Sequence, residues 1–325
     1  MSGFFDGLVA INHLPNNNEL FAAYILTRRF DLTSVDYRDA HKIHTSTTLK
    51  FKMIYEQNSK VREKVTSFDD KNGISHCIFL PNDEMLIINS FDLNTFTLEV
   101  VILFEYKNKH SIFYDGHITD PRIFYNNPMI WDLIKSNKIN QLLLDTTSIH
   151  IKKFKITETV CERIIRILQS NKILQINLIL EEFGHEDLLA ALADRGVKIW
   201  LDANRDIIFK SRNNVINHPR KRKFCVNQIE AQIFVSSEMP QREMIRKRFE
   251  ELQIATVAFC TNLDYDKEKS SDSGLFNIKY TTHQTFPDAH FLAEFIGPRE
   301  IVPIQPNITA EINEIISELK DVCRR

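Results

Sequence analysis

Residues 142–147, Leu142-Leu143-Leu144-Asp145-Thr146-Thr147, carry an apolar run directly into a carboxylate and two hydroxyls. A short apolar run closed by polar residues is typical of a buried strand, and it places Asp145 at the carboxyl end of that strand. Upstream, residues 112–117 form a second apolar run that ends in Tyr114-Asp115-Gly116-His117. Whether the protein is an enzyme depends on whether the rest of the chain supplies further catalytic or metal-binding side chains.

On the amino-terminal side of this region, the pattern favours short strands separated by Asn, Asp and Lys turns. The predicted strands are Ala22–Thr27, Ser75–Leu80, Met85–Ser90, Leu98–Tyr106 and Ser111–Tyr114.

From about residue 157 the pattern changes to alternating helices and strands, which predicts a parallel sheet. The predicted helices are Thr157–Leu168, Glu186–Asp194, Gln241–Leu252, Asp288–Ile296 and a last helix from about Thr309, which turns Ile312, Ile315, Ile316 and Leu319 inward. The predicted strands are Ile173–Leu180, Val197–Leu201, Ala231–Ser236, Ile254–Cys260, Leu275–Tyr280 and Ile301–Ile304.

The composition is that of a soluble globular protein. The chain has 325 residues, of which 43% are hydrophobic and 26% charged, and no apolar run approaches the roughly 18–20 residues that span a bilayer. Five scattered cysteines predict free thiols in a reducing compartment. Because no apolar run is long enough to span a bilayer, we expect no membrane partner.

The overall charge gives no support for nucleic-acid binding, because a net charge of −2 is low for a protein held by phosphates. One local run, Arg220-Lys221-Arg222-Lys223, is strongly basic. Such a tetrad is a candidate DNA contact or a nuclear import signal, and a solvated loop is the alternative.

Several segments occur in an order that matches one family pattern. They are residues 24–27, 113–121, 142–147, 183–186, 280–286 and 297–303. This order resembles the β-CASP branch of the metallo-β-lactamase fold, and within it the DNA cross-link repair nucleases of the Artemis and Apollo group. The resemblance covers nearly the whole chain and rests on the Leu-Asp-Thr-Thr box, the turn before Glu186 and the ending from His283 to Pro303.

The resemblance implies an α/β fold with two domains. Residues 1–150 and 275–325 would form a metallo-β-lactamase-like αββα sandwich, and residues 151–274 would form the inserted β-CASP-like domain. Asp145 and His283 would stand at two family positions, with His283 near the phosphate of the scissile bond.

The chain departs from the family where the family binds zinc. The family's H-x-H-x-D-H loop corresponds to Arg28-Arg29-Phe30-Asp31 here, and arginine cannot act as a ligand. The family's G-H-C-P-G-S turn falls near residues 94–99, which lack its histidine and glycines. The bridging carboxylate of the family falls on His117, a weak candidate ligand that cannot bridge two metals. We therefore expect no cofactor and treat Asp145 and His283 as vestigial.

Each of these polar residues also has a structural interpretation. Asp145 at a strand end can be a cap, and His283 can be a hydrogen-bonded remnant. His41 and His44 have the spacing of a ligand pair, but that spacing is common and no carboxylate accompanies it. For His185 the expectation is a solvated residue at a helix start.

Two functions from different classes follow. The preferred one is a noncatalytic pseudonuclease in the nucleus, acting as a binding or scaffold subunit in DNA repair, telomere or chromosome maintenance. The alternative is a divergent metal-dependent DNA 5′ exonuclease, with zinc held by His117, Asp145, His283 and Asp31 or Asp115. A third, weaker interpretation is a metal-free nucleic-acid binder. A protein partner is expected, with the final helix and the Thr261–Gly274 loop as candidate contact surfaces.

Overall fold

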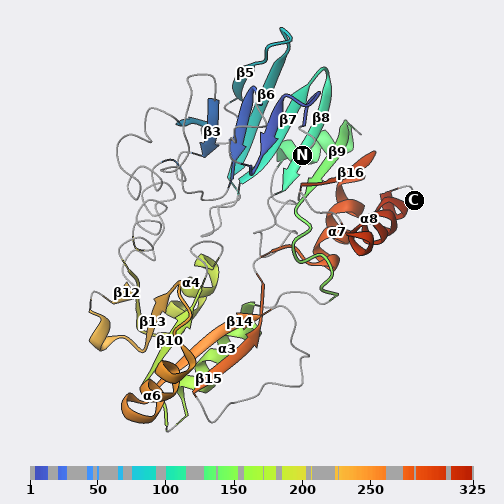
Figure 1. Cartoon of the computed structure of the whole chain (residues 1–325). Coiled ribbons are helices and arrows are strands. Elements are labelled where there is room, and N and C mark those ends of the chain that lie inside the picture. Colours follow the sequence, from blue (N-terminus) through green and yellow to red (C-terminus); the bar gives the residue numbers. More distant parts are fainter. Residues whose placement is uncertain are drawn as a thin grey trace. The chain divides into compact units, whose positions relative to one another are not determined.

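The protein is a mixed α/β protein, as the sequence predicts (Figure 1). The structure, a computed structural model, describes residues 4–13, 21–27, 42–46, 50, 65–68, 75–92, 100–114, 128–136, 138–152, 157–170, 172–180, 185–202, 206, 224–225, 227–260, 274–281, 283–304 and 309–323. The chain divides into two compact units, Met1–Lys153 with His283–Arg325, and Phe154–Thr282.

The first unit contains two sheets. The four-stranded sheet has the order β1-β2-β3-β4 and is parallel throughout; its strands are β1 (Val9–Ile11), β2 (Ala23–Leu26), β3 (Lys42–Ser46) and β4 (Val65–Phe68). The six-stranded sheet has the order β16-β9-β8-β7-β6-β5 and is mixed. Its strands are β5 (Ser75–Phe79), β6 (Met85–Asp92), β7 (Val100–Tyr106), β8 (Lys109–Tyr114), β9 (Ile139–Leu144) and β16 (Glu300–Pro303).

Strand β9 is apolar along its carboxyl half because it is buried on both faces. Leu143 belongs to a core that joins the two sheets, together with Ile25 of β2 and Phe104 of β7. Leu142 and Leu144 point the other way, into a core shared with helices. Successive side chains of a strand alternate between the two faces, so a strand between two cores has no solvent-facing position for a polar residue.

Three helices pack against the second core of this unit. They are α2 (Pro128–Lys135), α7 (Phe286–Ile296) and α8 (Ala310–Cys323). In α8, Ile316 and Leu319 are buried and Ile312 and Ile315 are partly buried against this core, which are the four positions that the sequence turns inward. The unit therefore has three described layers: helices, the six-stranded sheet and the four-stranded sheet.

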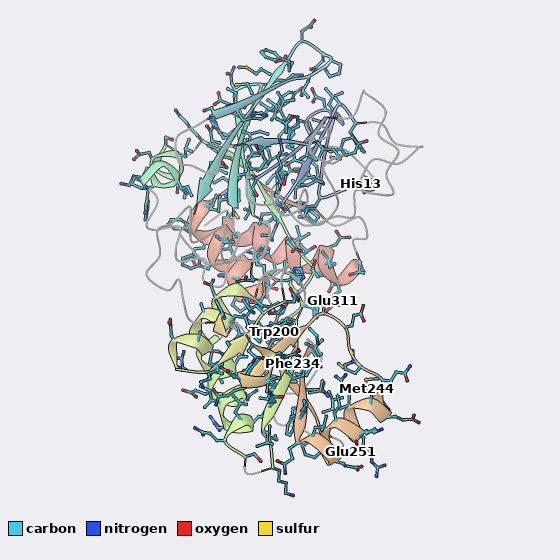
Figure 2. All side chains as sticks on the ribbon, turned by 90° about the vertical axis from the view of Figure 1, so that its left-hand side faces the viewer. His13, Trp200, Phe234, Met244, Glu251 and Glu311 are labelled. Atoms are coloured by element: carbon cyan, nitrogen blue, oxygen red, sulfur yellow. The ribbon has the colours of Figure 1, made fainter. Side chains whose placement is uncertain are left out.

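The second unit is a six-stranded parallel sheet of order β12-β11-β13-β10-β14-β15. Its strands are β10 (Gln175–Ile179), β11 (Ile199–Trp200), β12 (Phe224–Cys225), β13 (Ile233–Ser236), β14 (Ile254–Cys260) and β15 (Leu275–Lys279). Trp200 and Phe234 lie side by side on adjacent strands (Figure 2). The helices are α3 (Thr157–Leu168), α4 (Glu186–Asp194) and α6 (Arg242–Leu252), with the short η3 (Gln228–Glu230).

The elements agree with the sequence patterns in type, with small shifts at their ends. Strand β15 pairs with β14 inside the second unit, whereas the sequence places the domain boundary at residue 275, ahead of this strand. Strands β1, β3, β4 and β12, helix α2 and the short η3 have no counterpart in the sequence prediction. The strands have two to five residues, and β3 and β4 carry polar residues, so no period-two pattern identifies them.

Within the part of the chain that the structure describes, no helix is long and apolar enough to cross a membrane. Several predicted features lie outside the described residues, among them the loop at residues 261–273 and the basic run Arg220-Lys221-Arg222-Lys223.

Candidate functional site

Asp145 closes the turn that follows β9. Its carboxylate is fully buried, and Oδ1 accepts hydrogen bonds from the Thr147 backbone N–H at 2.9 Å and the Thr147 hydroxyl at 2.6 Å. An Asp side chain that bonds to the backbone two residues ahead fixes a tight turn. The structural interpretation of Asp145 as a loop hydrogen-bonder therefore describes one of its two oxygens.

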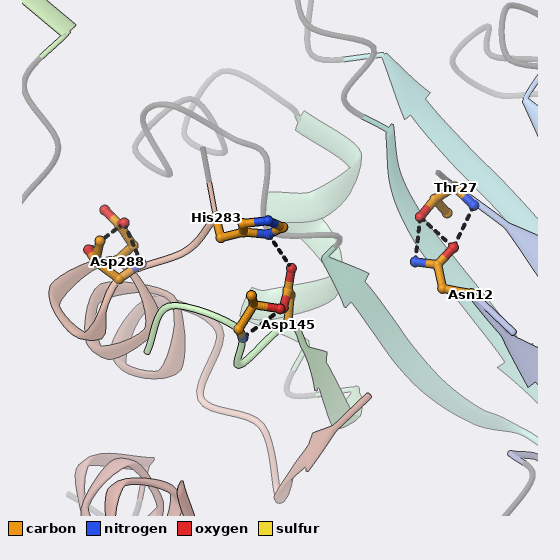
Figure 3. Close-up of polar contacts among 7 residues, drawn as sticks. Asn12, Thr27, Asp145, His283 and Asp288 are labelled. Carbon is orange, nitrogen blue, oxygen red and sulfur yellow. Dashed lines mark hydrogen bonds and ion pairs between the residues drawn. The ribbon is translucent and has the colours of Figure 1, made fainter. Parts of the chain in front are cut away.

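The second oxygen of Asp145 holds His283. The distance from Asp145 Oδ2 to His283 Nδ1 is 3.0 Å, and the two residues are 138 positions apart in the chain (Figure 3). A carboxylate can only accept, so the Nδ1 atom of the imidazole carries the proton and Nε2 has the lone pair when the ring is neutral. The His283 side chain keeps 17% of its surface exposed, while the Asp145 side chain has none.

Helix α7 fixes the segment that carries His283. Thr285 precedes the helix, and Asp288 Oδ2 accepts from the Thr285 backbone N–H at 2.9 Å and the Thr285 hydroxyl at 2.6 Å. This capping box satisfies amide groups that a helix start otherwise leaves open. The backbone N–H of Phe286 also donates to the carbonyl of Ile151 at 3.0 Å, which ties the helix start to the loop after β9.

Gln284 is an unusual neighbour of this pair. Its side chain is fully buried, and neither the amide oxygen nor the amide nitrogen has a hydrogen-bond partner among the described residues. A buried polar group that makes no hydrogen bond costs about 1–3 kcal/mol. The sequence prediction did not single out Gln284, because burial of an isolated Gln before a helix leaves no sequence signal.

The end of β2 is held in a similar way. The Asn12 side chain bridges to Thr27: its Nδ2 donates to Thr27 Oγ1 at 2.8 Å, and its Oδ1 accepts from the Thr27 backbone N–H at 2.8 Å (Figure 3). Thr27 is the last described residue before the stretch Arg28-Arg29-Phe30-Asp31, which lies outside the described residues. The structure thus fixes the strand that leads into this stretch.

The sequence-predicted site residues are brought together in part. Asp145 and His283 form a direct pair, whereas His117, Asp115 and Asp31 lie outside the described residues. Among the described residues, no group of three or more His, Cys, Asp or Glu side chains could hold a metal ion. The pair by itself can orient one imidazole and present its Nε2 to a proton or to a phosphate oxygen.

A second histidine pair involves His44. Its Nδ1 lies 3.0 Å from Nε2 of His76, which is on β5, so the two rings join the two sheets of the first unit. His41, which has the spacing of a ligand pair with His44, lies outside the described residues. Burial lowers the pKa of His76 below its ordinary value.

The expectation for His185 was wrong. The side chain is only 6% exposed, and its ring stacks on Phe259 at 5.7 Å and lies 5.9 Å from Tyr280. A helix-start position is usually solvated, but here α4 begins at the carboxyl ends of the strands, where β14 and the end of β15 supply aromatic cover.

The comparisons with known proteins show a fold likeness. No protein-family model matches the chain, and no curated protein matches it significantly. The chain is similar to a solved structure described as a protein of unknown function from Enterococcus faecalis V583, at a TM-score of 0.51 and 10% sequence identity. The likeness covers 90% of this chain and 77% of that one, and it concerns the fold alone.

Proposed function

We propose that this protein is a noncatalytic relative of the DNA cross-link repair nucleases, with a metallo-β-lactamase-like unit and an inserted β-CASP-like unit. It would act in the nucleus as a binding or scaffold subunit in DNA repair, telomere or chromosome maintenance. It would need no catalytic metal, and a protein partner would use its surface. DNA contact through Arg220-Lys221-Arg222-Lys223 is part of the same proposal.

The state of Asp145 carries this proposal. Both of its oxygens are committed inside the fold, Oδ1 to Thr147 and Oδ2 to His283, and no part of the side chain is exposed. A carboxylate in this state stabilises a turn and orients a ring. The sequence adds that Arg28, Arg29 and Phe30 occupy the stretch where the family holds zinc.

The layers within the first unit, and the place of the second unit in the sequence, support the family assignment. Two sheets share a core, helices α7 and α8 cover the other face of the six-stranded sheet, and a parallel α/β unit is inserted between residues 153 and 283. The described layers supply the helix, sheet and sheet of such a sandwich, and a separate unit lies between the two sequence segments that form them. The second helical layer belongs to the proposal.

The alternative, a divergent metal-dependent 5′ exonuclease, is favoured by one observation. A buried carboxylate that orients a partly exposed imidazole is also an arrangement that moves protons in hydrolases. Under this alternative, His117 and Asp31 or Asp115 would complete a metal site with Asp145 and His283, and the metal would activate water for attack on a phosphodiester.

A nuclease assay separates the two. The full chain, purified without chelator, is incubated with zinc and 5′-phosphorylated single- and double-stranded DNA, with an active relative of the family alongside. We expect no cleavage above background. Cleavage by the wild type that Asp145→Ala and His283→Ala both abolish would establish the exonuclease instead. Cleavage that survives both changes would indicate a contaminant or another site.

The binding role has its own test, which is proximity labelling from the chain in nuclei. We expect repeated labelling of chromosome-maintenance proteins, reduced when Arg220, Lys221, Arg222 and Lys223 are replaced by Ser together. A chain that stays outside the nucleus would contradict the proposed location.

A further inference from the structure

Among the described residues, strand β5 (Ser75–Phe79) forms one end of the six-stranded sheet and pairs with β6 on one side (Figure 1). The backbone N–H of Leu80 donates to the Glu84 carbonyl, so the register places the backbone groups of His76 and Ile78 toward β6. By the alternation of an antiparallel ladder, Ser75, Cys77 and Phe79 direct their N–H and C=O groups away from the sheet.

The residues of β5 itself include none of the types that usually block a sheet edge. The strand Ser75-His76-Cys77-Ile78-Phe79 contains no Lys, no acidic residue, no Pro and no Gly. One face next to this edge is apolar and exposed: Phe79 is 76% exposed, Met85 opposite it is 40% exposed, and Cys77 is exposed. An uncharged edge beside exposed apolar side chains is a surface on which another strand can pair.

We propose that a second copy of this chain pairs with β5, antiparallel and about a two-fold axis at Cys77, so that the two six-stranded sheets become one continuous sheet. A two-fold axis uses the same patch on both copies and closes the assembly at a dimer. The inference does not rest on the proposed function.

The strand is complementary to itself in this register. Ser75 of one copy lies opposite Phe79 of the other, so a small side chain faces a large one at both ends. Ser75 Oγ already donates to Asn89 Oδ1 at 2.6 Å, so an aromatic ring that covers Ser75 leaves no unsatisfied hydroxyl donor. No charged residue of the strand meets its own copy, so no like-charge repulsion opposes this occupant.

Cross-linking between the two copies of Cys77 can show whether the strands pair in this register. Directly opposite, hydrogen-bonded residues of antiparallel strands have Cα atoms about 5.5 Å apart. That spacing falls within the roughly 4.4–6.8 Å that a disulfide spans. Of the other described free cysteines, Cys161 is buried and Cys260 and Cys323 are only partly exposed.

The test is sedimentation velocity of the full chain under reducing conditions over a wide concentration range, together with oxidative or short bismaleimide cross-linking. We expect a reversible dimer, weakened at least about ten-fold by Phe79→Lys, which places a charge beside the edge. Leu174→Lys, at another well exposed apolar residue (67% exposed) in the other unit, should leave the dimer intact. Cys77→Ser should abolish the cross-linked dimer and preserve the reversible one.

Circular dichroism checks that Phe79→Lys is folded, and cross-linking of the wild type tests the register without any variant. If the wild-type chain is monomeric at every concentration, the proposal is wrong. This holds even if the β5 edge of the monomer binds an unrelated extended peptide. A dimer that Phe79→Lys does not weaken, or whose cross-link survives Cys77→Ser, overturns it as well.

Discussion

Asp145 Oδ2 lies 3.0 Å from His283 Nδ1, which joins the turn after β9 to the segment before α7 across 138 residues of chain. The whole second unit lies between these two residues in the sequence. The pair therefore fastens the two ends of the inserted segment to one point of the first unit. The free energy that the pair contributes to stability can be measured.

A double-mutant cycle measures this coupling. Asp145→Ala removes a buried acceptor of three hydrogen bonds and should lower the free energy of unfolding by about 2–4 kcal/mol. His283→Ala should cost less, and the coupling between the two should lie between about 0.5 and 3 kcal/mol. Urea denaturation gives the values, and Asp132→Ala, at an exposed carboxylate, should change stability by less than about 0.5 kcal/mol. Strictly additive losses would mean that the two side chains do not stabilise one another.

Replacing Gln284 by an apolar residue of similar size should stabilise the protein. Its buried amide makes no hydrogen bond to any residue that the structure describes, so Gln284→Met should remove a desolvation cost and raise the free energy of unfolding by about 1 kcal/mol. Gln141→Met is the matched control, because the Gln141 amide accepts from Ser111 at 3.1 Å and donates to Glu300 at 2.9 Å. That control should be destabilised. A loss of stability in Gln284→Met would show that a water or a ligand group satisfies the amide in solution.

The His44–His76 contact predicts how stability changes with acid. Burial holds the pKa of His76 below its unfolded value of about 6.5, so the unfolded chain binds more protons at mildly acidic pH. The contribution is present above that unfolded pKa and is lost as pH falls through the lower folded pKa. His76→Gln should flatten the dependence of the urea midpoint on pH in this window, whereas His150→Gln, at an exposed ring, should leave it unchanged. An unchanged slope in His76→Gln would refute this assignment.

Alanine substitutions at two glycines distinguish the stability cost of backbone strain from that of a steric clash. Gly274 and Gly196 both have positive φ, at +76° and +82°, but a Cβ on Gly274 would collide with the Phe249 ring, while Gly196 has open space. Gly196→Ala should cost about 1 kcal/mol from the left-handed backbone alone. Gly274→Ala should cost at least about 1 kcal/mol more, because overpacking adds to the same strain. Equal losses in thermal or urea unfolding would show that the Phe249 ring moves aside freely.

The sequence predicts the strands and helices whose apolar residues form a continuous run or follow a regular period. Strand β9 is recognisable because Leu142, Leu143 and Leu144 fill two cores, and α8 because its inward residues follow the helical period. Strand β3 is not recognisable, since Lys42–Ser46 is short and polar and its burial comes from neighbouring strands that lie far away in sequence.

The candidate site shows the same limit. The order of motifs singles out Asp145 and His283, but the pattern says nothing of the contact between them. The spacing of His41 and His44 says nothing of the contact that the structure shows, between His44 and His76, 32 residues away. His185 was expected in solvent, but the rings of Phe259 and Tyr280 cover it. These rings come from strands that are distant in sequence, so the local sequence does not reveal them. Long-range contacts of this kind have no local signal.

Metal content tests the central claim, that this fold no longer holds a catalytic metal, most directly. Zinc, manganese and iron are measured by elemental analysis on the full chain purified without chelator and dialysed against zinc at micromolar concentration, with an active family member treated identically. The account predicts stoichiometric metal in the active relative and none above background in this chain. Stoichiometric zinc that is lost in both Asp145→Ala and His283→Ala would contradict it.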